Sequence, residues 1–375
     1  MNKTVLSVLQ LTGTSSDLYE IAEKVISGER ISVEDGVVLF EKGSLPYLSI
    51  LADFVYHRHN GNHVFFNRNF HIEPTNICIN HCAFCSYRRR KGQNGSWEFS
   101  TEEMLGKIES YKGTAATEVH IVGGVHPDRD VYFYAELLKK IKNIIPSISI
   151  KAFTAVEIEA MCRFASLSVE QGLKLLKESG LDSMPGGGAE IFDEALRHKI
   201  CPDKTRTEDW LRIHRTAHEL GIQTNSTMLY GLIENYAQRV DHLNRLRELQ
   251  DITGGFNAFI PLKFRHYNNL FSYVEETTTI EDLKNYAVSR IFLDNIPHLK
   301  AYWPMIGKSV AQLSLAFGVD DLDGTIDDST KIYSMAGAAE QNPSASTAEL
   351  ITMIKGAGRI PVERDTLYNR IKEYN

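Results

Sequence analysis

Hydrophobic residues recur along the chain in short runs that alternate with longer stretches of helical period. Runs that are rich in β-branched and aromatic residues and bounded by Gly, Pro or Asn are typical of strands. Apolar residues that return every three or four positions indicate amphipathic helices between them. Eight runs are predicted as strands: 67–74, 117–124, 147–153, 182–190, 223–231, 255–264, 298–305 and 314–321.

The intervening helices carry start and stop signals. Ser100 with Glu103 and Ser168 with Gln171 have the spacing of capping boxes, and Gly180 is placed to end a helix. Because strand and helix alternate eight times, we expect an α/β fold, a parallel (β/α)8 TIM-type barrel with its chemistry on the loops that follow the strands. A doubly wound open sheet is the alternative.

The two ends of the chain differ from this repeating part. Residues 1–62 carry apolar residues at helical spacing and are predicted as an N-terminal helical extension, followed by the barrel at 63–324. Residues 325–375 are rich in Ser, Ala and Gly before a final amphipathic piece, and we expect a C-terminal helical cap over one barrel end.

Composition narrows the class of protein. Hydrophobic content of 43% and charged content of 24% are typical of a soluble globular chain. A formal net charge of −7 argues against a nucleic-acid partner, and no apolar run approaches the roughly 18 residues of a membrane span. With an odd number of cysteines and no secretory signal, we expect a cytoplasmic protein whose thiols are free to bind metal.

Three of the five cysteines lie within eight residues, immediately after the first predicted strand: Cys78, Cys82 and Cys85. A structural zinc site normally uses four ligands in pairs, and Cys162 and Cys201 stand alone. Three thiolates on one short loop suit a [4Fe-4S] cluster, whose fourth iron is then open to another ligand. A zinc loop completed by a histidine, or three inert buried thiols, are the alternatives.

Three cations occupy strand ends where apolar residues are usual. Lys151 ends the third predicted strand, and Lys263 and Arg265 end the sixth. Since the ends of parallel strands meet at one barrel mouth, they would suit an anionic substrate with more than one carboxylate. Solvated loop charges are the alternative for each residue.

The spacing C-x3-C-x2-C, with the aromatic Phe84 before the last cysteine, closely resembles the signature of the radical S-adenosylmethionine (SAM) enzymes. The resemblance implies that the cluster cleaves the sulfonium of SAM reductively to methionine and a 5′-deoxyadenosyl radical. It also implies a reductant such as flavodoxin or ferredoxin.

The same resemblance implies which residues bind SAM. Glycines at the end of the second strand would offer carbonyls to the methionine amino group, Glu190 would accept the ribose hydroxyls, and Arg197 would bind the methionine carboxylate. Without the resemblance, a tight turn, a first-turn acid and a surface arginine are equally good interpretations. The implied SAM-binding residues are Phe84, Tyr87, Gly123, Gly124, His126, Glu190 and Arg197.

Longer stretches of the sequence resemble one particular family of radical SAM enzymes. NRNFHIEPTNIC, HLKAYWPMIG and FGVDDLDGTIDDSTKIYSMAG look like the aminofutalosine synthase family of the futalosine route to menaquinone. That family implies a small dicarboxylate aryl enol ether as substrate, 3-[(1-carboxyvinyl)oxy]benzoate, with aminodeoxyfutalosine, methionine and bicarbonate as products.

The alternatives are the related dehypoxanthine futalosine cyclase, the tyrosine-cleaving radical SAM enzyme of deazaflavin-cofactor synthesis, and a non-catalytic iron–sulfur carrier. The stretches CAFCSYRRR and PLKFR favour the synthase over the cyclase.

Overall fold

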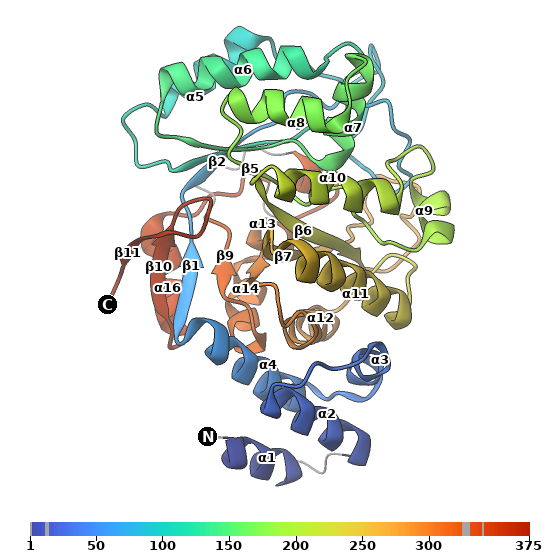
Figure 1. Cartoon of the computed structure of the whole chain (residues 1–375), viewed down its shortest axis with the longest axis vertical. Coiled ribbons are helices and arrows are strands. Elements are labelled where there is room, and N and C mark those ends of the chain that lie inside the picture. Colours follow the sequence, from blue (N-terminus) through green and yellow to red (C-terminus); the bar gives the residue numbers. More distant parts are fainter. Residues whose placement is uncertain (1, 12–14, 325–330, 340) are drawn as a thin grey trace.

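A curled sheet forms the centre of the computed structural model, which describes residues 2–11, 15–324, 331–339 and 341–375 (Figure 1). The strand order is β11-β10-β1-β9-β8-β7-β6-β5-β4-β3-β2, and every neighbouring pair is parallel except β10 and β11. The strands are β1 His63–Phe66, β2 Asn69–Ile72, β3 Glu118–Ile121, β4 Ser149–Ala152, β5 Ser183–Met184, β6 Gln223–Tyr230, β7 Phe256–Lys263, β8 His298–Ala301, β9 Asp321–Leu322, β10 Ile360–Arg364 and β11 Arg370–Glu373.

Helices cover the outside of this sheet, and the N-terminal helices lie together at one end of the molecule (Figure 1). The helices are α1 Asn2–Leu11, α2 Ser16–Ser27, α3 Val33–Lys42, α4 Leu45–Asn60, α5 Thr101–Ser110, α6 Val131–Ile144, α7 Ala155–Phe164, α8 Val169–Glu178, α9 Glu194–Ile200, α10 Thr207–Glu219, α11 Tyr236–Thr253, α12 Thr279–Phe292, α13 Trp303–Ile306, α14 Lys308–Ser314, η1 Leu315–Phe317, α15 Ile332–Met335 and α16 Thr347–Gly356. None of the described helices has the length and apolar content needed to cross a membrane.

Alternation of strand and helix from β2 to β9 confirms the predicted TIM-type architecture. The capping boxes at Ser100 and Ser168 are both formed. Two of the predicted strands are much shorter than expected. Pro185 follows β5 and cannot donate a ladder hydrogen bond, and residues 314–317 are helical, so that β9 begins only at Asp321.

The seam of the barrel lies between β1 and β2, which are separated by Asn67 and Arg68 alone. β1 pairs with β9 and β10, whereas β2 pairs with β3. A Cβ atom at Gly324 would lie 1.3 Å from the Asn67 carbonyl oxygen. The backbone after β9 therefore packs directly against the backbone between β1 and β2, which requires a glycine.

The C-terminal part differs from the expected helical cap. It contains α15 and α16, but Ile360–Arg364 forms β10 beside β1, and Arg370–Glu373 folds back as the antiparallel β11. Ile360 and Val362 are β-branched and β1 offers them an open edge, which explains a strand where a helix was expected. The boundaries at 62 and 324 stay a prediction.

Candidate active site

A cavity of about 320 Å³ runs from the cysteine loop into the barrel. Its lining brings together residues from many strand ends, as the barrel prediction requires. The predicted site residues that line it are Cys78, Cys82, Phe84, Cys85, Tyr87, Gly123, Gly124, Lys151, Glu190, Lys263 and Arg265. His126 and Arg197 do not line this cavity.

The cysteine loop, residues 78–85, is fixed by backbone hydrogen bonds at several points. The Cys78 amide donates to the Arg89 carbonyl at 3.0 Å, and the Ile79 amide donates to the Val125 carbonyl at 3.0 Å. The Ala83 amide donates at 2.7 Å to Ile200, the last residue of α9. The cysteine loop is therefore held by the loop after β3, by the end of α9 and by the segment at Arg89.

Three consecutive arginines after the last cysteine also hold the loop, and sequence reasoning missed them. Arg90 donates to the carbonyls of Cys78 at 3.4 Å and Ile79 at 3.1 Å, and Arg88 donates to the Cys82 carbonyl at 3.4 Å. Arg89 donates to the Ser86 carbonyl at 2.9 Å. The run RRR at 88–90, two residues after the motif, was the available signal.

The thiols suit a group that brings its own positive charge. Burial raises the pKa of Cys82 and of Cys85, and the nearby Lys204 ammonium opposes this only in part. Since a metal-binding cysteine must be a thiolate, iron can supply the missing charge. Cys78, Cys82 and Cys85 line the same cavity, and their binding of a cluster stays a prediction. Within the described ranges, no three His, Cys, Asp or Glu side chains are grouped to hold a single metal ion.

The glycines after β3 serve a close backbone contact. A Cβ atom at Gly124 would lie 2.3 Å from the Ile77 carbonyl oxygen, and one at Gly123 would lie 2.8 Å from the Thr75 carbonyl oxygen. The Gly123 amide donates to Glu157 at 3.1 Å. Burial raises the pKa of Glu157 to about 7, although the hydrogen bonds from Thr154 and Gly123 lower the pKa and offset part of this shift.

Glu190 lies beside the cysteine loop in a left-handed conformation, with φ of 51°. Such a backbone is costly for a non-glycine residue and is common at functional sites. Its carboxylate contacts Lys204 at 2.5 Å, and the Lys204 ammonium lies 5.6 Å from the centre of the Phe84 ring. Lys204 lines the cavity and was missed by the sequence analysis.

Arg197 has a different environment from the one expected. Its buried guanidinium donates to the carbonyls of Gly188 at 3.4 Å, Ile191 at 3.3 Å, Ala189 and Thr205. It therefore holds the turn that carries Glu190, and Lys204 is the cation that faces the cavity on this side. A role in binding the methionine carboxylate stays a prediction.

Two further predicted residues have clear partners. The Tyr87 hydroxyl donates to the Thr75 carbonyl at 3.0 Å, and burial raises the pKa of Tyr87. His126 Nε2 lies 2.9 Å from a Glu98 carboxylate oxygen, behind the cavity wall. Tyr87 thus supports the strand end that leads into the cysteine loop.

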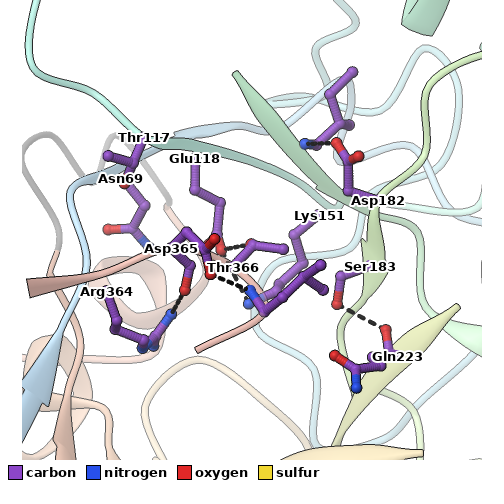
Figure 2. Close-up of polar contacts among 12 residues, drawn as sticks. Asn69, Thr117, Glu118, Lys151, Asp182, Ser183, Gln223, Arg364, Asp365 and Thr366 are labelled. Atoms are coloured by element: carbon purple, nitrogen blue, oxygen red, sulfur yellow. Dashed lines mark hydrogen bonds and ion pairs between the residues drawn. The ribbon is translucent and has the colours of Figure 1, made fainter. Parts of the chain in front are cut away.

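The three predicted cations line the same cavity, and each is paired with a carboxylate. Lys263 Nζ donates to Asp282 at 2.8 Å and to the Thr277 carbonyl at 2.6 Å. Arg265 lies 3.1 Å from Glu276 and donates to the Gly337 carbonyl at 2.8 Å. Lys151 lies 3.1 Å from Glu118 (Figure 2), and both side chains are 3% exposed or less.

The deep end of the cavity is charged, which the sequence analysis did not foresee. We call this end the cavity floor, because Glu118 is the first residue of β3 and therefore lies at the end of the strand away from the cysteine loop. Lys300 donates to Asp323 at 2.9 Å there. Thr366, which follows β10, donates to Glu118 (Figure 2). The cavity floor comprises Glu118, His120, Lys151, Lys300 and Asp323.

This barrel with its cysteine loop defines a class of enzyme. The radical SAM superfamily matches residues 72–246, the CofH/MqnC C-terminal region matches residues 253–374, and the chain belongs to the radical SAM superfamily. It is 46% identical over 363 residues to the aminodeoxyfutalosine synthase of Thermus thermophilus, covering 96% of this chain and 97% of that protein.

Other relatives are less similar. The chain is 38% identical to 5-amino-6-(D-ribitylamino)uracil–L-tyrosine 4-hydroxyphenyl transferase 2 of Methanosarcina barkeri, covering 94% of this chain and 92% of that protein. It is 36% identical to the cyclic dehypoxanthine futalosine synthase of Streptomyces coelicolor, over 95% and 89%. The crystal structure of methylornithine synthase shares the fold, with a TM-score of 0.73, 17% identity and coverage of 91% and 97%.

Proposed function

We propose that the protein transfers the 5′-deoxyadenosyl group of SAM to 3-[(1-carboxyvinyl)oxy]benzoate. The products are 6-amino-6-deoxyfutalosine, methionine and bicarbonate, and the reaction belongs to menaquinone biosynthesis in the cytoplasm. SAM is consumed as a substrate, since its adenosyl group ends in the product. The observation that carries this proposal is the similarity to aminodeoxyfutalosine synthase, 46% identical along nearly the whole of both chains.

Cys78, Cys82 and Cys85 would hold a [4Fe-4S] cluster. After reduction by an external donor such as flavodoxin or ferredoxin, the cluster would supply the electron that splits the sulfonium of SAM. The protein's own residues hold the reactants around this centre. Glu190 and Lys204 offer an acceptor and a donor beside the loop for the ribose and the carboxylate of SAM.

The rest of the cavity suits an aryl dicarboxylate. Val122, Ile260 and Leu262 form an apolar section that matches an aromatic ring. Lys263 and Arg265 add cationic groups near the mouth, although each already has a carboxylate partner. Partnered cations bind an incoming carboxylate through their remaining N–H donors, since Lys has three and Arg five.

The 36% and 38% identical relatives carry out different chemistry according to their names, and the product separates these activities. The test is an anaerobic reaction of the reconstituted, reduced protein with SAM and 3-[(1-carboxyvinyl)oxy]benzoate, followed by mass spectrometry. We expect a covalent adenosyl adduct with the mass of 6-amino-6-deoxyfutalosine. Free 5′-deoxyadenosine as the only adenosyl product would refute the proposal, and conversion of dehypoxanthine futalosine or of tyrosine with the ribitylaminouracil would replace it.

A further inference from the structure

His120 and Lys151 both present polar groups to the cavity floor. His120 lies beside Lys151 in the sheet register, one strand apart, and both face the cavity. His120 Nε2 is buried and has no hydrogen-bond partner among the described residues. An unpaired buried donor or acceptor is costly, and in a ligand cavity it indicates a position for a ligand atom.

Lys151 has donors to spare as well. Its ammonium carries three N–H groups, and Glu118 at 3.1 Å is its one ion-pair partner in the described part of the chain. Lys142 is a useful contrast, because its ammonium donates to both Asp182 and the Ile148 carbonyl at 2.8 Å, outside the cavity.

The two cations of the cavity floor are each paired with a carboxylate, Lys151 with Glu118 and Lys300 with Asp323, so an incoming anion would bind through the N–H donors that these pairs leave over. Burial lowers the pKa of Lys151; Glu118 offsets this in part, while Lys300 and Arg364 repel the ammonium. Burial lowers the pKa of His120 to about 3, with repulsion from His71 and Lys151 adding to the effect, so its ring is neutral at pH 7. A substrate carboxylate beside Lys151 would accept from the remaining N–H groups of its ammonium, and a neutral imidazole can also donate to it.

We propose that His120 and Lys151, with Lys300 adjoining, form the subsite for the ring carboxylate of the aryl substrate. This inference rests on the proposed function and extends it. The enol-ether end of the substrate must lie toward the cysteine loop, where the adenosyl group is released. The ring carboxylate then points the other way, past the apolar section of Val122, Ile260 and Leu262, to the cavity floor.

The proposal separates the two carboxylates of the substrate, so it is tested with a pair of substrates. One is 3-[(1-carboxyvinyl)oxy]benzoate and the other is 2-phenoxyprop-2-enoate, which lacks only the ring carboxylate. For the native protein we expect kcat/KM to favour the dicarboxylate by at least about 100-fold, because the analogue leaves buried polar groups unpaired. Lys142→Met is the matched control and should keep this preference.

Lys151→Met alone would leave Glu118 buried without its partner. The informative variants are therefore the double variant Lys151→Met/Glu118→Gln and the single variant His120→Leu. We expect the preference to fall to less than about tenfold in both variants, and 5′-deoxyadenosine release from SAM without substrate reports whether each variant still assembles its cluster. His120→Gln keeps a hydrogen-bonding side chain at this position, so it should retain part of the preference that His120→Leu loses.

Two results would overturn the subsite. One is a native preference near unity, and the other is a native preference that survives in variants that still release 5′-deoxyadenosine. A variant that does not fold is replaced by Lys151→Arg, for which a shifted preference supports the subsite and an unchanged one counts against it. Failure of the native protein to form any adduct from the dicarboxylate would instead refute the proposed function, so the two failures are distinct.

Discussion

At the cysteine loop the functional groups come from a single stretch of eight residues, whereas at the cavity floor they come from β3, β4, β8 and the chain after β9. Backbone hydrogen bonds fix the loop, and the arginines that follow it donate to its carbonyls. Ion pairs fix the cavity floor, and each ties together distant parts of the sequence.

This difference has consequences for how each end responds to change. A ligand thiol in the loop can be removed without disturbing a buried charge. Removing one partner at the cavity floor leaves the other charge unpaired, which is more costly than losing the pair. We therefore expect loop variants to lose chemistry and floor variants to lose selectivity, with some loss of stability.

The largest effect is expected at the loop. Cys82→Ala should abolish 5′-deoxyadenosine formation, because a cluster with one fewer thiolate is lost or misassembled. Cys201→Ala is the control, since Cys201 is buried and does not line the cavity. Iron content and 5′-deoxyadenosine yield after anaerobic reconstitution check this. Equal losses in the two variants would contradict the ligand assignment.

A smaller loss is expected when the loop keeps its thiols and loses a support. Arg90→Met removes the donor to the Cys78 and Ile79 carbonyls, each bond worth about 1.5–3 kcal/mol for a charged donor. We expect the iron retained after gel filtration to fall at least about twofold. Lys91→Met changes the next residue, which pairs with Asp128, and should retain native iron. Full iron retention by the Arg90 variant would show that the backbone bonds suffice.

At the cavity floor, Thr366→Val tests the contribution of the C-terminal segment. The change preserves shape and removes the hydroxyl that donates to Glu118. We expect KM for the dicarboxylate to rise about two- to tenfold, as for one net hydrogen bond, with 5′-deoxyadenosine release unchanged. Thr352→Val, on the exposed side of α16, is the control. An unchanged KM would place Thr366 outside substrate binding.

The last prediction concerns the pH dependence of stability and leaves the activity aside. Burial raises the pKa of Glu157 from 4.5 to about 7 in the folded protein, so the protonated form is the one that folding favours. Its stabilising contribution is complete below about pH 4 and is lost as the pH rises through 7. Glu157→Gln does not titrate. The free energy of unfolding of the native protein should therefore fall relative to the variant by on the order of 3 kcal/mol between pH 4 and pH 8.

Denaturant titrations of both proteins at pH 4 and pH 8 measure this difference. Parallel behaviour of the two proteins across that range would contradict the raised pKa of Glu157.

The fold and the loop could be predicted because their signals are local. The strand–helix rhythm gave the barrel, and three cysteines in eight residues are visible without any long-range information. β10 could not be predicted in this way, because Ile360–Arg364 becomes a strand by pairing with the edge of β1, about 300 residues away in sequence.

The cavity floor was hidden for the same reason. Lys151 was noticed as a strand-end cation, but nothing in the sequence pairs it with Glu118, and Lys300 and Asp323 are unremarkable until β8 and β9 are neighbours. Arg197 and Lys204 lie seven residues apart, and only the structure reveals which of them faces the cavity.

The central claim is that Cys78, Cys82 and Cys85 hold a four-iron cluster with one iron open to SAM. Mössbauer spectroscopy of anaerobically reconstituted protein, with and without SAM, tests it most directly. The account predicts four irons per chain and one iron whose signal changes when SAM is added. Zinc bound to the thiolates, or a cluster whose four irons are all unaffected by SAM, would contradict it.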